Sequence, residues 1–263
     1  MQPMYHLNAQ ATLSRQDVLR SETYRSLMPA FPYQSGAIFL SNAIVIVRTA
    51  IGDYIRLMSC DGTNNMWDER YQTHEYIFGD QPCQWLIVNQ HRLRTSGRAL
   101  ALGDGEGRNG VFLAELGLHV TSVDLSEVGL SKARDLAAKR GVSIQTVQAN
   151  LEHYEIDPQS QDLVVSIYCY LPDAIRKLVH SRAEEALKQG GLFVLEAFHH
   201  SQLKYQSGGP KTTDLLYDLD ALIGDFQALR ILEAFDGLCY LDEGARHSGL
   251  GHIVRLVLQK PQQ

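Results

Sequence analysis

A turn dense in glycine, followed by an acidic residue at the end of the next apolar run, is the part of this sequence whose residue types and spacing could do chemistry. Gly103, Gly105 and Gly107 follow the apolar run ALAL, and Asp124 lies near the end of the run HVTSVDL. Glycines let the backbone approach a ligand closely, and the start of the following helix offers unpaired N–H groups. An acid at the tip of a second strand is placed to bind ribose hydroxyls. The stretch 100–126 therefore predicts the opening β-α-β unit of a nucleotide-binding domain.

The pattern around this stretch predicts the elements that must position it. Apolar runs alternate with helical periodicity, and Ser126 and Gly141 bracket one helix as N-cap and stop. The predicted strands are 99–102, 119–125, 142–149, 162–171, 192–198, 228–235 and 252–260, and the predicted helices between them are 109–116, 127–140, 173–189 and 212–226. We expect an α/β fold, doubly wound, with a mostly parallel seven-stranded sheet and a C-terminal antiparallel hairpin.

Composition restricts the class of partner. The net charge of −6 gives no general attraction to nucleic acid or to anionic membranes, so a small-molecule partner is expected. Four cysteines lie far apart with no CxxC pair, which favours reduced thiols in the cytoplasm and indicates no metal site. The most apolar early run, residues 37–51, is shorter than the roughly 20 residues of a membrane-spanning helix.

The N-terminal part of the chain divides at Met66. Residues 1–65 show no sustained periodicity and are expected to form a weakly ordered extension, in which the run 37–51 is either a strand or an isolated apolar patch. Residues 66–263 are expected to form the domain. Its first segment, 66–93, is rich in aromatic residues that either cover a flat ligand or pack this segment onto the sheet: Trp67, Tyr71, Tyr76, Phe78 and Trp85.

The glycine turn also fits GxGxxG, the pattern of nicotinamide dinucleotide enzymes, with Asp124 following 19 residues after Gly105. Three features favour another class. No tyrosine has a lysine four residues later, as one large class of reductases requires. The glycine pattern reads GxGxG from Gly103, which is earlier than a dinucleotide-binding motif would place its first glycine. The chain also ends in a predicted antiparallel pair, where a dinucleotide-binding fold would continue with parallel strands. An NAD(P)-dependent oxidoreductase remains the alternative.

Residues 66–261 resemble the class I S-adenosylmethionine-dependent methyltransferases, in particular a small-molecule branch similar to the tellurite-resistance and thiopurine-type enzymes. The motifs that carry the resemblance, in chain order, are WDERY (67–71), EYIFG (75–79), LALGDGEGRN (100–109), VTSVDLS (120–126), DLVVSIYCYLP (162–172), LKQGGLFVLEAF (187–198), QSGGP (206–210) and DEGARHSGLGHIVRLV (242–257). The resemblance implies a Rossmann-like fold and methyl transfer from S-adenosylmethionine to a small acceptor such as a thiol or a chalcogen oxyanion.

The resemblance also implies roles for particular residues. Asp124 matches the acid that binds both ribose hydroxyls, and Asn150 stands where the family often has an aspartate at the adenine amino group. Ser166 ends the fourth strand, beside the sulfonium. The full set of cofactor-binding residues expected from the resemblance is Trp67, Tyr71, Gly103, Asp104, Gly105, Gly107, Asp124, Leu125, Asn150, Leu151 and Ser166.

One position departs from the family pattern. The acid that usually lies two residues before the first glycine is replaced by Ala101. Asp104, inside the turn, either substitutes for it or only stabilises the turn.

Catalytic residues are less well indicated. Tyr168 lies at the end of the fourth strand, and His199 and His200 follow the fifth, at the sheet edge where ligands of open α/β folds bind. These three are the candidates to contact the acceptor or take its proton. Displacement at an activated sulfonium carbon depends mainly on positioning, so neither a metal nor a strong base is expected for an anionic acceptor. A non-catalytic cofactor-binding protein is the remaining alternative.

Overall fold

The computed structural model describes residues 66–244 and 246–262. The predictions for the N-terminal extension, residues 1–65, lie outside the described residues.

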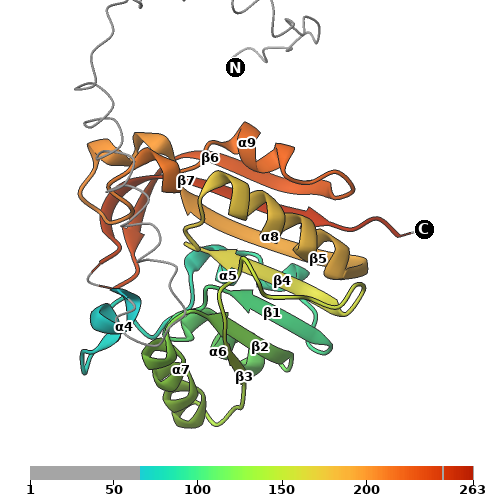
Figure 1. The fold of residues 1–263 in the computed structure, drawn as a ribbon, viewed down its shortest axis with the longest axis horizontal. Helices are drawn as coiled ribbons and strands as arrows, with labels where there is room; N and C mark the ends of the chain where they lie inside the picture. Colours follow the sequence, from blue (N-terminus) through green and yellow to red (C-terminus); the bar gives the residue numbers. More distant parts are fainter. Residues whose placement is uncertain (1–65, 245, 263) are drawn as a thin grey trace, which may run out of the picture. The chain divides into compact units, whose positions relative to one another are not determined.

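A seven-stranded sheet organises the described chain, with the strand order β3-β2-β1-β4-β5-β7-β6 (Figure 1). Strands β1 to β5 are parallel, and β7 is antiparallel to both β5 and β6. The strand bounds are Arg98–Leu102 (β1), His119–Asp124 (β2), Gln145–Gln148 (β3), Gln161–Ile167 (β4), Leu187–Phe198 (β5), Arg230–Asp242 (β6) and Ser248–Gln259 (β7). The predicted doubly wound sheet with a terminal antiparallel hairpin is confirmed.

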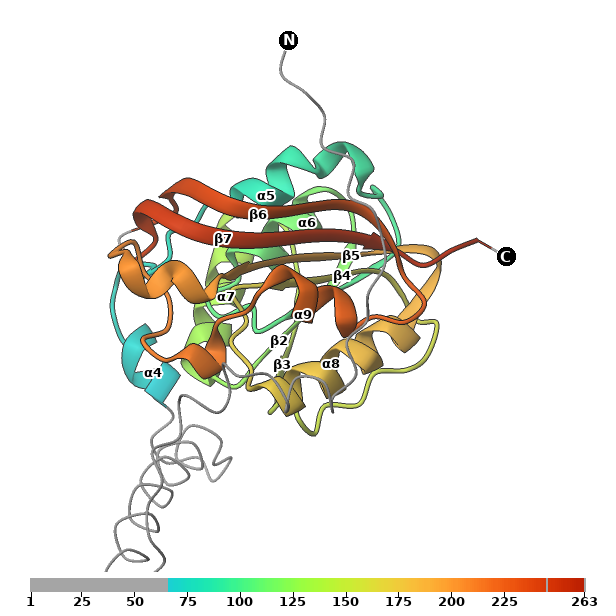
Figure 2. The same cartoon turned by 90° about the horizontal axis from the view of Figure 1, so that it is seen from above.

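Helices cover both faces of this sheet. Their bounds are Met66–Tyr71 (α4), Gln84–Val88 (α5), Arg108–Glu115 (α6), Glu127–Lys139 (α7), Asp173–Ala186 (α8) and Leu219–Gly224 (α9). Helices α5 and α6 contribute to one apolar core and α8 and α9 to the other, and Figure 2 shows α5 and α8 on opposite sides of the strands. Short 3₁₀ turns lie at Gln90–Arg92, His200–Lys204 and Thr213–Leu215.

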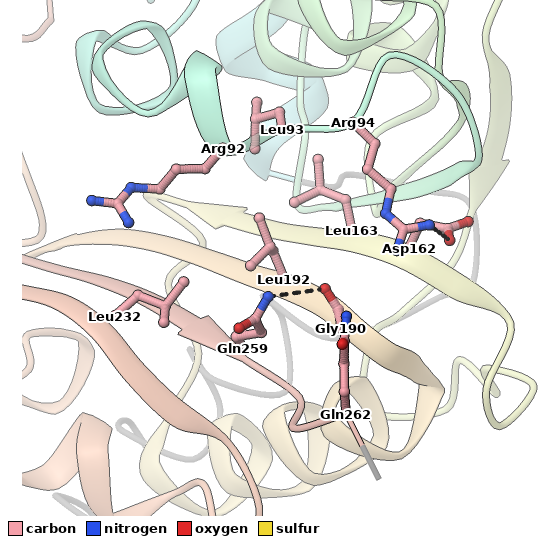
Figure 3. A pocket seen from close by; sticks show the side chains of 10 residues that line it. All are labelled: Arg92, Leu93, Arg94, Asp162, Leu163, Gly190, Leu192, Leu232, Gln259 and Gln262. Carbon is pink, nitrogen blue, oxygen red and sulfur yellow. Dashed lines mark hydrogen bonds and ion pairs between the residues drawn. The ribbon is translucent and has the colours of Figure 1, made fainter.

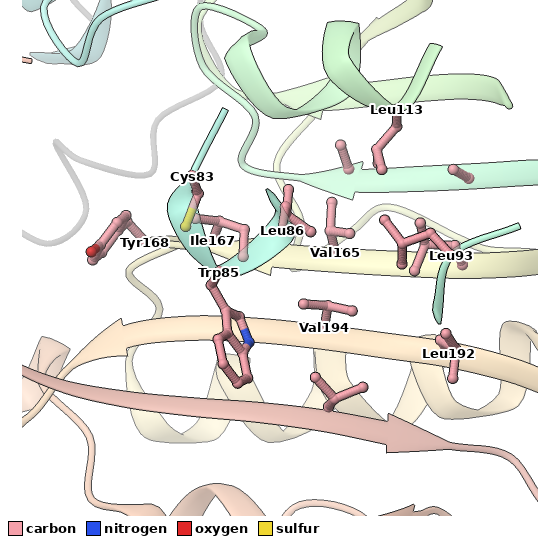
Figure 4. Close-up of a cluster of buried hydrophobic side chains, with 14 of the residues drawn as sticks. Cys83, Trp85, Leu86, Leu93, Leu113, Val165, Ile167, Tyr168, Leu192 and Val194 are labelled. Carbon is pink, nitrogen blue, oxygen red and sulfur yellow. The ribbon is translucent and has the colours of Figure 1, made fainter. Parts of the chain in front are cut away.

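The core on the α5 side is built from alternate residues of the central strands. Val165 and Ile167 of β4 and Val194 of β5 point toward α5, where Trp85 and Leu86 meet them (Figure 4). Because neighbouring residues of a strand point to opposite faces, the intervening residues build the second core under α8 and α9. Continuous apolar runs such as β4 are therefore buried on both faces, as expected of parallel strands.

Local sequence signals predicted α7 correctly. The Ser126 hydroxyl accepts a hydrogen bond from the Gly129 N–H (3.0 Å) and caps α7, and Gly141 follows that helix with φ of +72°. The side chains of Leu130, Ala133, Leu136 and Ala137 are buried, as the periodicity of the sequence predicts.

Several predicted elements were wrong in extent. The strand predicted over 162–171 ends at Ile167, and the strand predicted over 192–198 begins at Leu187. Helix α8 ends at Ala186 rather than Gln189, because Leu187 already pairs with Gln161 of β4. The predicted helix 212–226 is α-helical only in α9, with a 3₁₀ turn at Thr213–Leu215 before it, because Tyr217 is extended and its N–H donates to the Phe198 carbonyl. The long connection predicted within the hairpin is mostly strand, since β6 runs on to Asp242 and β7 begins at Ser248.

Among the helices of the described residues, none combines the length and the apolar character that crossing a membrane requires.

Candidate functional site at the carboxyl edge of the sheet

The glycine turn joins β1 to α6 at the carboxyl edge of the sheet. Gly103, Gly105 and Gly107 have φ of +61°, +55° and +85°, a region that disfavours other residues. The Gly103 N–H donates to the Val123 carbonyl of β2 (2.8 Å), which fixes the turn against the neighbouring strand. A Cβ atom at Gly105 would collide with the Tyr71 hydroxyl. The turn is therefore a bare backbone surface that a side chain of α4 approaches closely.

Asp104 turns inward from the glycine turn. Its carboxylate accepts hydrogen bonds from the Gly110 N–H (3.1 Å) and from the Ser122 hydroxyl (2.6 Å), so it ties α6 to β2. Burial raises the pKa of this carboxyl to about 7. These contacts are those of a residue that stabilises the turn. That Asp104 also replaces the acid missing at Ala101 stays a prediction.

Asp124 ends β2 directly beside the turn. Its two carboxylate oxygens accept hydrogen bonds from the N–H groups of Gly105 (2.8 Å) and Ser126 (2.9 Å). Burial raises its pKa to about 6. A carboxylate has about four acceptor sites, so further donors, such as ribose hydroxyls, can still bind.

The residues expected at the adenine follow β2 and β3 at the same edge. Leu125 is half-buried, and Asn150 and Leu151 are buried just after β3. The Asn150 side-chain oxygen accepts a hydrogen bond from the Glu152 N–H (2.9 Å), which orients the amide. The structure thus brings the predicted adenine and ribose residues to one edge.

Helix α4 lies over the glycine turn. The Tyr71 side chain is buried close to Gly105 and to Gly129 of α7, and Trp67 stacks on it with ring centroids 5.7 Å apart. Asp68 accepts hydrogen bonds from the Ser126 hydroxyl and from the Val128 N–H (3.2 Å), which holds α4 on the start of α7. The aromatic residues of α4 therefore cover the turn.

Two charged residues that the sequence analysis missed hold the segment after α4. Lys132 forms an ion pair with Glu106 of the glycine turn and donates to the carbonyls of Thr73 (3.1 Å) and Glu75 (2.7 Å). The Ile77 N–H donates to the other Glu106 oxygen (2.8 Å). Nothing in the local sequence marks this pair, because its members lie on different elements.

The carboxyl end of β4 carries Ser166 and Tyr168. Ser166 is buried, and burial raises the pKa of the nearby Cys169 thiol to about 12. Tyr168 has φ of +53°, a strained value for a non-glycine residue, and its hydroxyl bonds to the Glu196 carboxylate. Burial, followed by the charge of Glu196, raises its pKa well above the usual value, so the phenol is neutral.

His247, from the turn between β6 and β7, packs against Tyr168. Its ring centroid lies 4.3 Å from that of Tyr168, 4.7 Å from that of Phe78 and 5.3 Å from that of Phe198. Burial lowers the pKa of His247 to about 3, so the imidazole is neutral. The sequence favours a structural role for His247, which reaches this edge only because the hairpin folds over it.

Three buried polar atoms near Tyr168 have no hydrogen-bond partner among the described residues. They are His247 Nδ1, the Tyr170 hydroxyl and Arg108 Nη1. The other terminal nitrogen of Arg108 pairs with Glu243 at 2.8 Å. The charge of Arg108 lowers the pKa of His247, after burial, and acts on Tyr170 as well. Buried polar groups are nearly always paired, and the described residues supply no partner for these three atoms.

The two histidines proposed from sequence lie elsewhere. His199 stacks on His252, with ring centroids 4.1 Å apart, and burial lowers its pKa. His200 is partly exposed, with its Nδ1 3.9 Å from an Asp218 oxygen. Neither has a ring contact with Tyr168 or His247 among those found in the described residues.

A hollow of about 340 Å³ lies at the opposite, amino edge of the parallel strands (Figure 3). Its polar side chains are mostly paired: Arg94 with Asp162 (3.2 Å), and the Gln259 amide with the Gly190 carbonyl (3.3 Å). This hollow is remote from the glycine turn and is not part of the site.

The comparisons with known proteins agree with this geometry. Residues 99–191 match the family model described as a methyltransferase domain. A curated methyltransferase from Geobacillus sp. (strain WCH70) is 33% identical over 130 residues, which are 46% of this chain and 51% of that protein. The chain thus spans about half the length of the curated relative it matches.

Solved structures show the same fold. TehB from Haemophilus influenzae matches with a TM-score of 0.54 and 20% identity, over 66% of this chain and 61% of that one. A SAM-dependent methyltransferase from Methanosarcina mazei matches with a TM-score of 0.52 and 16% identity, over 67% and 98%.

Residues 99–191 are thus similar to a methyltransferase domain, and the described domain has the fold of S-adenosylmethionine-dependent methyltransferases. The predicted resemblance is confirmed, and an NAD(P)-dependent oxidoreductase is not favoured.

The residues at this edge fit S-adenosylmethionine, the cofactor that the resemblance implies. The glycine turn offers backbone without side chains, Asp124 offers a carboxylate beside it, and buried polar atoms without partners lie nearby. The individual cofactor-binding assignments stay predictions.

Proposed function

We propose that this protein transfers a methyl group from S-adenosylmethionine to a small acceptor, either a thiol or a chalcogen oxyanion or a similar nucleophile. The bound cofactor supplies a methyl group on an activated sulfonium. The acidic chain, with a net charge of −6, supports a small-molecule acceptor rather than nucleic acid or a membrane.

The cofactor would lie along the carboxyl edge of the sheet. Asp124 would bind the ribose hydroxyls, Asn150 would orient the adenine, and the glycine turn would pass under the methionine part. Tyr71 and Trp67 would cover it and exclude water, which strengthens polar contacts inside the site. The remaining residues assigned to this site are Asp104, Leu125, Leu151 and Ser166.

The proposed binding site of the methyl acceptor is supported by the unpaired buried atoms on Arg108, Tyr170 and His247. An arginine nitrogen only donates hydrogen bonds, and a phenol hydroxyl can donate one. Such a set suits an acceptor that is already anionic. Tyr168 and His247 are held neutral by burial, and an anionic nucleophile needs no strong base.

Calorimetric titration with S-adenosylhomocysteine tests the cofactor site. We expect micromolar binding, roughly −7 to −8 kcal/mol, for the wild type. Asp124→Ala should lose most of this affinity, and Asp124→Asn should lose a large part while keeping one acceptor for the Gly105 N–H. Asp135→Asn, an exposed change on α7, is the matched control and should bind as the wild type does. Tight nicotinamide binding without S-adenosylhomocysteine binding would refute the proposal.

A panel of acceptors tests the reaction itself. Thiols, chalcogen oxyanions and amines are incubated with S-adenosylmethionine, and S-adenosylhomocysteine release is measured. We expect turnover with ionised thiols or oxyanions, and a large loss of it in His247→Phe or Tyr170→Phe at unchanged cofactor affinity. Cofactor binding without methylation of any acceptor would support a non-catalytic cofactor-binding protein instead.

A further inference from the structure

Three potential metal ligands meet on the face of the sheet under α8 and α9, at the carboxyl end of β5. The His199 N–H donates to the His252 carbonyl (2.9 Å), so these residues are neighbours across β5 and β7. In the β6–β7 pairing, Asp236 lies opposite Val254, two residues from His252. Paired residues, and residues two apart on a strand, share a face. The sheet register therefore brings the three side chains together.

Their contacts are close. The rings of His199 and His252 stack with centroids 4.1 Å apart, and His252 Nε2 lies 2.7 Å from an Asp236 oxygen. One ligand atom from each residue lies within 4.8 Å of the others. The side chains of His252 and Asp236 are 20% and 34% exposed, which leaves them room to adjust and gives an ion access.

We propose that His199, Asp236 and His252 bind one divalent transition-metal ion, with Zn²⁺ as the reference ion. Two imidazoles and one carboxylate on one side of an ion are a donor set that suits zinc and its first-row neighbours. Metal–ligand bonds of about 2.0–2.2 Å place neighbouring ligand atoms about 3.4 Å apart, so the more distant ligand atoms would close by about an ångström and the 2.7 Å contact would open slightly. His199 Nδ1 accepts a hydrogen bond from the Ser201 N–H (3.0 Å), and coordination would exchange this bond for one to the metal.

A second cluster of suitable residue types does not qualify. Cys83, Glu196 and Glu243 also meet, but their carboxylates already pair with Arg255 (2.6 Å) and Arg108 (2.8 Å). Within the described residues, no arginine or lysine forms an ion pair or a hydrogen bond with the side chains of His199, Asp236 or His252.

The metal site is distinct from the methyl-transfer site. Phe198 packs against His247 at the acceptor side, whereas the next residue, His199, packs against His252. A metal ion here would join β5, β6 and β7 near the hairpin turn that carries Glu243 and His247. The expected consequence is stabilisation of the hairpin, and the inference does not depend on the proposed methyl transfer.

Zinc binding to the full chain, free of any purification tag and stripped with a chelator, tests the proposal. Calorimetry with Zn²⁺ and visible absorption with Co²⁺ should show one ion per chain. His252→Gln and Asp236→Asn should each weaken binding at least tenfold, while His200→Gln, the neighbouring histidine outside the cluster, should not. Zn²⁺ should raise the Tm of the wild type but not that of His252→Gln.

Equal zinc affinity in the wild type and both cluster variants would overturn the proposal. Circular dichroism without metal shows whether each variant is folded, and Asp236→Asn, on the partly exposed edge strand, serves if His252→Gln does not fold. Titration of the same samples with S-adenosylhomocysteine reads the proposed function separately, so failure of one proposal does not hide the outcome of the other.

Discussion

Two buried carboxyl groups, Asp104 and Asp124, define the site at the scale of single residues. Asp104 faces inward to Gly110 and Ser122, whereas Asp124 holds the glycine turn through Gly105. Burial raises both pKa values, to about 7 and about 6. Asp104 therefore stabilises the start of α6, whereas Asp124 has carboxylate oxygens that can still accept hydrogen bonds from a ligand.

Asp104→Asn should change how stability depends on pH. The unfolded pKa is about 3.9 and the folded one about 7, so between these values the folded wild type binds more protons and loses stability as pH rises. The variant lacks this loss. Relative to the wild type it should gain stability on the order of 3 kcal/mol between pH 4 and pH 8.

Thermal unfolding at several pH values measures this gain. His247, whose pKa is lowered to about 3, favours folding as pH rises toward 6.5, but it is present in both proteins and cancels in the difference. The exposed Asp135→Asn change should show no such trend. A pH-independent difference between Asp104→Asn and the wild type would contradict the assignment.

At the scale of elements, the segment 66–80 is held over the glycine turn mainly by polar anchors on α7. Asp68 binds the start of α7, and Lys132, one turn further along, binds carbonyls of the segment and Glu106. The side chain of Tyr71, the last residue of α4 within this segment, is buried. A cover held in this way can release a ligand by breaking a few hydrogen bonds rather than a large apolar contact.

Lys132→Met should weaken cofactor retention. The change removes the ion pair with Glu106 and the bonds to the Thr73 and Glu75 carbonyls, so we expect S-adenosylhomocysteine to dissociate about tenfold faster, a change of about 1.4 kcal/mol. Stopped-flow displacement measures the rate. Arg134→Met, on the same helix but bound to Glu127 and Thr146 outside this segment, is the matched control. Equal dissociation rates in the two variants would show that Lys132 does not secure the segment.

At the scale of the whole domain, a buried ion pair joins the start of α6 to the turn between β6 and β7. Arg108 begins α6, and Glu243 lies in the turn between β6 and β7, yet both are buried and 2.8 Å apart. The pair closes the antiparallel hairpin over the carboxyl edge and places His247 beside Tyr168. Breaking it should affect both folding and the acceptor side.

Glu243→Gln should destabilise the fold, because it leaves the Arg108 charge buried and unpaired. Loss of one partner of such a pair costs about 3–5 kcal/mol. The double variant Arg108→Met, Glu243→Leu should regain most of this, since apolar side chains of similar volume tolerate burial. Urea unfolding measures both. If the double variant were as unstable as Glu243→Gln, the cost would come from lost packing instead of from the unpaired charge.

The sequence by itself determined the order of the elements and the position of the glycine turn at the carboxyl edge of the sheet. Glycines at positive φ, the Ser126 cap and the apolar periodicities are local signals, because each depends on residues a few positions apart. Asp124 could be placed at the edge on the same basis, since it ends a strand next to the glycine turn.

Only the tertiary structure decided which distant residues meet at that edge. The Glu106–Lys132 pair, the contact of His247 with Tyr168 and the cluster of His199, Asp236 and His252 each join residues from separate elements. Such contacts depend on strand order and register, which the periodicity of a single segment does not encode. The same cause shortened the predicted helix before α9, where Tyr217 pairs with Phe198 of β5 instead of continuing a helix.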